Sequence, residues 1–343
     1  MILLQQSMLD GLTGDDIRIE KIREKLQAAI ELEHSTVPLY LYALYSLDPA
    51  KNGEIVSIIR SVVVEEMLHM TLASNVLNAI GGSPRLDDPK FIPTYPGPLP
   101  GGVEKQLTVQ LAPFSMAQLE IFLTIEEPQD PLNFKLAAAQ GDGITIGDFY
   151  RHIAKAIAKL GPSIFVHGPH NQVGPDLVEE SVVVTDVASA GQAITTIVEQ
   201  GEGTSKTPLE IIGKGYAHYY RFMQIKKHYL LEPKGDSFAY DGPPVPFDPA
   251  GVYPVPTQTA GWSYPPGSAA AAENDTFNYT YTNLLKALDA LFNGQNTAAQ
   301  MNRTLGLMMS LKELAKAMMS GIPDSKRYSG PTFQYQPANL QHG

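Results

Sequence analysis

The sequence contains no cysteine among its 343 residues. This absence excludes disulfide frameworks, thiolate metal sites, iron–sulfur clusters and cysteine nucleophiles together. A metal bound by this chain therefore has to be held by oxygen and nitrogen ligands.

Long apolar runs and clustered positive charge are also missing. No hydrophobic run reaches the length of a membrane span, and residues 1–12 lack the basic region of a secretory signal. The net charge of −11 argues against nucleic-acid binding, because phosphate recognition depends on clustered lysine and arginine. We therefore expect a cytoplasmic protein that acts on a small molecule and binds neither a membrane nor nucleic acid. The sequence leaves open whether the protein forms a homo-oligomer.

Against this background, the stretch from Ser61 to Gly82 is unusual because it places charge inside a nearly all-apolar helix. Glu65, Glu66 and His69 stand in its middle. Glu66 and His69 are spaced i, i+3, so they project from the same face of the helix. A buried carboxylate must be paired, protonated or bound to metal. Glu-x-x-His on an inward face is typical of di-iron carboxylate sites, which also need a Glu from neighbouring helices.

The preceding segment, residues 15–47, is predicted to form one long helix with a kink at Pro38. A short turn at Asp48–Pro49 leads to a second helix over residues 52–80, which predicts an antiparallel pair with Glu33 facing Glu66. Glu33 shares one helical stripe with side chains that otherwise suit a core: Val37, Tyr40, Leu41 and Leu44.

The rest of the chain adds further helices and a change of composition after residue 232. Residues 85–102, rich in proline and glycine, suit an extended crossover. We predict short strands at 107–111 and 182–185, helices at 115–127, 145–160, 186–203, 209–231, 276–292 and 297–319, and an ordered aromatic wrap at 233–275. The domains expected are 1–232, carrying the metal site, and 233–343. The methionines of the last helix are expected to fill the core: Met301, Met308, Met309, Met318 and Met319.

The remaining metal ligands must come from later helices, and His218 is the best histidine available. A symmetric site would place Glu three residues before it, but that position is Gly215. Either Glu202 or Glu126 substitutes, or the second metal position is weakened or absent. Taken singly, each of these two residues is more often a solvated carboxylate at a helix end than a ligand. Tyr40 and Tyr42 could serve as redox or hydrogen-bonding groups, although packing is the commoner role. The segment Asp148-Phe149-Tyr150 could approach the site, although Asp148 suits the first turn of its helix equally well.

Several of these segments, taken in order, resemble the ferritin-like family named for iminophenyl-pyruvate dimer synthase. The resemblance covers residues 17–229 and rests on LEHSTVPLYLYALYSL, VVVEEMLHMTLASNVLNAIGGSPRL, IPTYPGPLPGG, LAPFS, IEEP, TIGDFY, IVEQGEG and HYYRF. It implies a mainly α fold, a ferritin-like four-helix bundle with a long proline-rich crossover, extra helices and a C-terminal helical extension. It also implies a metal site in the bundle.

From the resemblance and the motifs together we predict a non-haem iron enzyme, with one or two irons and with dioxygen or peroxide as oxidant. Its substrate would be a small, amino-acid-derived, aromatic imino or keto acid of secondary metabolism. The predicted ligands are Glu33, Glu66, His69 and His218, completed by Glu202 or Glu126, and the predicted catalytic residues are Glu66, His69 and Tyr40. The alternatives are a non-enzymatic or ferroxidase-like metal protein, and a helical scaffold whose buried carboxylates are protonated or paired.

Overall fold

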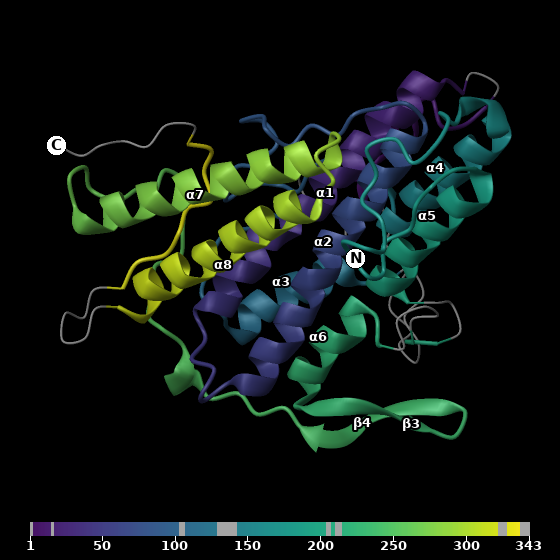
Figure 1. The fold of residues 1–343 in the computed structure, drawn as a ribbon. Helices are drawn as coiled ribbons and strands as arrows, with labels where there is room; N and C mark the ends of the chain where they lie inside the picture. Colours follow the sequence, from purple (N-terminus) through teal and green to yellow (C-terminus); the bar gives the residue numbers. More distant parts are fainter. Residues whose placement is uncertain are drawn as a thin grey trace.

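A computed structural model describes residues 3–14, 17–102, 107–128, 143–203, 207–209, 215–321 and 328–336, and within them the chain is mainly helical (Figure 1). None of the described helices is both long and apolar enough to cross a membrane.

The two longest helices, α1 (Ile19–Tyr45) and α2 (Gly53–Ala79), form the predicted antiparallel hairpin through the middle of the molecule (Figure 1). Pro38 lies inside α1, and the helix continues on both sides of it. Most side chains of α2 are buried, in agreement with the apolar residues found on nearly every side of this helix.

Four shorter helices pack beside the hairpin: α3 (Met116–Glu126), α4 (Ile146–Leu160), α5 (Val187–Glu202) and α6 (His218–Lys227). Helices α4 and α5 contact each other and lie against α1 and α2 respectively, whereas α3 and α6 form a second contacting pair. The ring of Tyr40 on α1 lies 4.7 Å from that of Phe122 on α3, so α3 also borders α1. Helix α1 is thus flanked by α3 and α4, and helix α2 is flanked by α5 and α6. The ends of these short helices meet near the middle of the long helices.

Local capping explains where several of these helices start. Ser115 accepts a hydrogen bond from the backbone N–H of Gln118, and Thr145 accepts one from that of Asp148. Both are the N-cap contacts expected of Ser and Thr before an apolar helix. The caps thereby set the boundaries of α3 and α4 close to those predicted.

The strand predictions were wrong. Val109 forms only an isolated bridge with Gly97, and residues 182–185 contain no strand. The helix predicted to run to residue 231 ends at Lys227, because His228 adopts a left-handed conformation with φ of 62°. The chain then turns into an antiparallel hairpin beyond α6, β3 (Tyr229–Lys234) and β4 (Ser237–Pro244). The described chain also contains β1 (Leu4–Gln5), paired with β2 (Gly143–Ile144), and the short 3-10 helices η1 (Gln6–Leu9), η2 (Pro162–Ile164) and η3 (Pro249–Gly251).

The aromatic wrap is ordered, as predicted, and follows the turn between α1 and α2. Asn52 donates to the carbonyls of Asp248 and Gly251, and the Tyr42 hydroxyl donates to the carbonyl of Pro256 at 2.5 Å. The wrap is shorter than expected because α7 (Ala269–Phe292) begins early, with Ser268 as its N-cap. Helix α8 (Ala298–Ser320) contacts α7 and α1. A domain division at residue 232 stays a prediction.

Candidate metal centre

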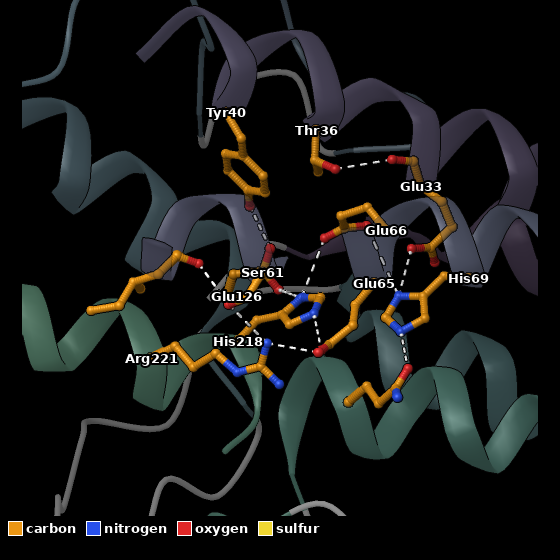
Figure 2. Close-up of polar contacts among 12 residues, drawn as sticks. Glu33, Thr36, Tyr40, Ser61, Glu65, Glu66, His69, Glu126, His218 and Arg221 are labelled. Atoms are coloured by element: carbon orange, nitrogen blue, oxygen red, sulfur yellow. Dashed lines mark hydrogen bonds and ion pairs between the residues drawn. The ribbon is translucent and has the colours of Figure 1, made fainter. Parts of the chain in front are cut away.

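Five side chains that could bind metal meet where the helix ends converge on α1 and α2 (Figure 2). Glu33 comes from α1, and Glu66 and His69 come from α2. Glu126 is the last residue of α3, and His218 is the first residue of α6. They form two sets, Glu33–Glu66–His69 and Glu66–Glu126–His218, and within each set the potential ligand atoms lie within 4.8 Å of one another. Glu66 belongs to both sets, so one carboxylate is placed to bridge two ions.

His69 is held with one ring nitrogen toward the carboxylates. Its Nδ1 lies 3.3 Å from Glu33 and 4.0 Å from Glu66, while its Nε2 lies 2.9 Å from the side-chain oxygen of Gln200. The amide nitrogen of Gln200 donates to Glu180 at 3.1 Å, which orients the amide oxygen toward His69. Since an amide oxygen only accepts, Nε2 is the nitrogen of His69 that donates to Gln200, and Nδ1 is left facing Glu33 and Glu66.

His218 has the same arrangement with a different outer partner. Its Nδ1 lies 3.3 Å from Glu66 and 3.4 Å from Glu126, and its Nε2 lies 3.1 Å from Glu65. Arg221 in turn pairs with Glu65 at 2.7 Å. The rings of the two histidines are stacked, with centroids 5.3 Å apart. An amide therefore orients His69, whereas a carboxylate orients His218, as in the carboxylate–histidine–metal contacts common around metal sites.

Two buried tyrosines donate to the outer carboxylates. The Tyr150 hydroxyl donates to Glu33 at 2.5 Å, and the Tyr40 hydroxyl donates to Glu126. Burial and the nearby carboxylates raise the pKa of both phenols well above the usual value. Both phenols are therefore neutral donors that fix the orientation of the carboxylates they contact.

Three carboxylates share this poorly solvated space. Burial raises the pKa of Glu66 well above its usual value, and the negative charges of Glu126 and Glu33 add to the effect. Burial would also raise the pKa of Glu33, but its contacts with His69 and Tyr150 hold it below the usual value. Burial would lower the pKa of His218, but Glu126, Glu65 and Glu66 raise it instead. The cluster holds more negative charge than its neighbours compensate unless it takes up protons or a cation.

The residues fit a divalent cation in their donor chemistry. Carboxylate oxygens and imidazole nitrogens suit iron, manganese and zinc. The Nδ1 of His218 is buried and has no hydrogen bond of suitable geometry among the described residues, although two carboxylates lie near it. An unpartnered nitrogen aimed at carboxylates is what a ligand atom shows in the absence of its ion.

A cavity of about 50 Å³ adjoins the cluster. Glu33, Glu66, His69, Glu126 and His218 form its polar side, and its apolar side is lined by Leu99, Ile125, Ile146, Ile197 and Val198. A cavity needs about 10–15 Å³ of such space for each water molecule, so this one has room for a few water molecules. The cavity admits a diatomic oxidant, whereas an aromatic substrate requires its apolar side to open.

The structure brings together five of the six predicted ligands. Glu126 contributes its carboxylate, and the side chain of Glu202, the last residue of α5, lies outside what the structure describes. Gly215 precedes the N-cap of α6, Ala217, so the i, i+3 relation expected between it and His218 does not exist. Of the two tyrosines considered, Tyr42 is turned away toward the wrap.

The outer partners Gln200, Glu180 and Arg221 were not foreseen. Arg221 follows His218 by three residues and could have been found from that spacing. Gln200 and Glu180 come from distant segments and left no such signal.

Comparison with known proteins agrees with the predicted fold. A family model described as Ferritin-like matches residues 26–227, which include all five clustered residues. No curated protein matches the chain. Among solved structures, a ferritin-like protein from Caulobacter vibrioides aligns over 92% of this chain and 97% of its own, with a TM-score of 0.60 and 24% sequence identity. At that identity the likeness concerns the fold alone.

Proposed function

This chain belongs to the ferritin-like family, and from that premise we propose that it is a non-haem iron oxidoreductase that binds two irons. The observation that carries the proposal is the position of Glu66, which is shared by two sets that each add one Glu and one His. The predictions from sequence left one or two irons open, and this shared carboxylate favours two.

In the proposed centre, Glu33 and His69 would hold one ion, Glu126 and His218 would hold the other, and Glu66 would bridge them. Iron bound there supplies one-electron redox chemistry and open positions for dioxygen or peroxide. Gln200 and Glu65 keep the histidine Nδ1 atoms facing inward.

The two tyrosines and Glu66 are the side chains that would take up and release protons. Tyr40 and Tyr150 are within hydrogen-bond contact of ligand carboxylates, so each can share a proton with its carboxylate as the charge of the centre changes. The pKa of Glu66 is raised by burial and by the neighbouring carboxylates, so Glu66 loses its proton when a cation replaces it. The apolar side of the cavity keeps water from the reacting groups.

We further propose that the substrate is a small aromatic imino or keto acid derived from an amino acid. The sequence resemblance to the family named for iminophenyl-pyruvate dimer synthase supports this substrate class. The apolar side of the cavity, formed by Leu99, Ile146 and Val198 among others, is compatible with an aromatic ring once it opens.

The test is anaerobic loading with Fe²⁺, followed by exposure to dioxygen with and without phenylpyruvate and ammonium, which together form the imine. We expect two irons per chain and oxygen consumption that continues over many turnovers only when the imine is present. A ferroxidase would instead consume oxygen only while Fe²⁺ remained and would accumulate iron beyond two per chain. Protein that takes up no iron would overturn the metal proposal itself.

A further inference from the structure

A second, much larger hollow lies away from the metal centre, between α2 and α8 with α1 as its floor. It has a volume of about 420 Å³. Its walls are mainly apolar and include Val37, Leu41 and Leu44 of α1, Val63 and Met67 of α2, and Met308 of α8. We call it the α2–α8 groove. Figure 1 shows α8 beside the α1–α2 hairpin, and contacts between α8 and α1 close one side of the groove.

The groove and the metal centre use different sides of α1. Glu33 and Tyr40 face the metal centre, whereas Val37, Leu41 and Leu44 face the groove. The single stripe predicted for these residues is therefore divided between two sites. The residues that line the groove and those that line the cavity at the metal centre do not overlap.

Two apolar side chains of the groove remain open to solvent. Val64 is 63% exposed and Met309 is 57% exposed, and both line it. The prediction that Met309 fills the core was wrong. Contiguous apolar surface left in water usually marks a binding site, and methionine side chains adapt readily to a ligand of irregular shape.

Three cations border the apolar lining: Arg60 on α2, and Lys312 and Lys316 on α8. None of them has an ion pair with any residue that the structure describes. Among the described residues no Asp or Glu lines the groove, although Glu313 stands close enough to influence the neighbouring Tyr45. On a chain with a net charge of −11, this local positive charge is a distinct feature.

We propose that the α2–α8 groove binds an amphipathic carboxylate, an aliphatic acyl chain whose carboxylate pairs with Lys312 and Lys316. The volume lies within the range of about 300–1,000 Å³ typical of small-molecule sites. The apolar walls match the acyl chain, and the adjacent lysines, spaced i, i+4 on α8, match the charged end.

Charge also argues against a second copy of the chain as the occupant. In a symmetric dimer the same patch faces itself across the two-fold axis. Arg60, Lys312 and Lys316 of the two copies would then approach one another in a poorly solvated interface, which is unfavourable. A small anion has no such conflict.

The proposal is tested by calorimetric titration of the full chain with decanoate and decyltrimethylammonium, each below its micelle concentration, and with 1-decanol below its solubility limit. These probes share one chain length and differ in the charge of the end group. We expect decanoate to bind most tightly and decyltrimethylammonium most weakly. Added salt should weaken the binding of decanoate and leave that of decanol unchanged.

Variants locate the site. The double variant Lys312→Gln/Lys316→Gln should weaken decanoate binding by about tenfold, as expected for two exposed charge pairs, and leave decanol binding unchanged. Met309→Glu, at an exposed position that folding tolerates, should weaken both decanoate and decanol. The matched control is Lys155→Gln, an exposed lysine on α4, which should bind all three probes like the wild type.

Equal binding of the three probes, or a double variant that binds decanoate like the wild type, would overturn the proposal. So would a wild-type dimer in sedimentation velocity that Met309→Glu dissociates and decanoate does not, because the patch would then be an interface between copies. These measurements do not depend on iron content, so they stand apart from the test of the metal centre.

Discussion

The Nδ1 nitrogen of His218 lies 3.3 Å from a carboxylate oxygen of Glu66, yet no hydrogen bond of suitable geometry joins them. The two residues come from different helices, α6 and α2, and both are buried. A cation between them would satisfy both atoms at once. Because Glu66 also reaches the set that contains His69, the two proposed ions depend on it in common, and the first prediction rests on this dependence.

The number of irons that a variant loses should depend on the set to which the substituted residue belongs. We expect Glu66→Ala to lose both irons, whereas His69→Ala and His218→Ala should each lose the iron that the missing imidazole held. All three variants should stay folded, because the apolar side chains of α1 and α2 still pack, and Glu66→Ala also removes a buried carboxylate whose desolvation opposes folding. Iron per chain after anaerobic loading, together with the thermal midpoint, measures this.

The matched control for these variants is Glu120→Ala, which removes an exposed carboxylate on α3 and should keep full iron content. If Glu66 and His69 were only a structural ion pair, wild-type protein would remain free of metal. Loss of one partner would then lower the free energy of unfolding by roughly 3–5 kcal/mol. That combination of results would contradict the metal centre.

The outer partners of the histidines should tune the two ion positions separately. Glu65→Gln should weaken one of two Co²⁺ binding steps by about 10–100-fold, because the carboxylate that orients His218 is lost. Gln200→Ala should weaken the other step, which involves His69. Visible absorption during Co²⁺ titration resolves the two steps, and variants that weaken the same step would show that the histidines do not serve separate ions.

Removal of the Tyr150 hydroxyl should lower the free energy of unfolding more in the iron-free protein than in the iron-loaded protein. Tyr150→Phe leaves Glu33 with one donor fewer, which should lower the free energy of unfolding by about 1–3 kcal/mol without iron. Bound iron compensates the carboxylate, so the difference should shrink on loading. Denaturant titrations with and without Fe²⁺ measure both values, and Tyr229→Phe, at a residue that is 47% exposed, is the control. A loss that is equal in both states would show that the hydroxyl does not act through the carboxylate.

Acid sensitivity should depend on His34, whose Nε2 contacts the Tyr281 hydroxyl at 2.6 Å and whose Nδ1 has no partner within the described residues. Burial lowers the pKa of His34 to about 3. In the unfolded chain this histidine has a pKa of about 6.5 and binds a proton below that pH, whereas in the folded protein it stays neutral. The free energy of unfolding therefore decreases as the pH falls below about 6.5. At pH 5 this loss amounts to roughly 2 kcal/mol.

Denaturant titrations from pH 5 to pH 7.5 test this prediction through the difference between variants. His34→Gln should remove that part of the pH dependence, whereas His170→Gln, at an exposed histidine, should keep it. Equal pH dependence in wild type and His34→Gln would show that His34 is protonated in the folded protein.

Local sequence determined the parts of this protein that rest on short-range periodicity. The i, i+3 spacing put Glu66 and His69 on one face of α2, and the short turn at Asp48–Pro49 made α1 and α2 antiparallel, which brought Glu33 opposite Glu66. The helical period is a property of the backbone itself, so these relations could be read without the fold.

Tertiary structure decided how the centre is completed and where the groove lies. Glu126 and His218 stand at the ends of α3 and α6, and Gln200 stands near the end of α5, so their approach depends on how these three short helices pack beside α1 and α2. The β3–β4 hairpin was missed because residues 229–231 also suit the end of a helix, and the proline- and glycine-rich residues after them indicated an irregular wrap. Contacts between helix ends and the left-handed turn at His228 arise from packing over long distances along the chain, which local periodicity does not encode.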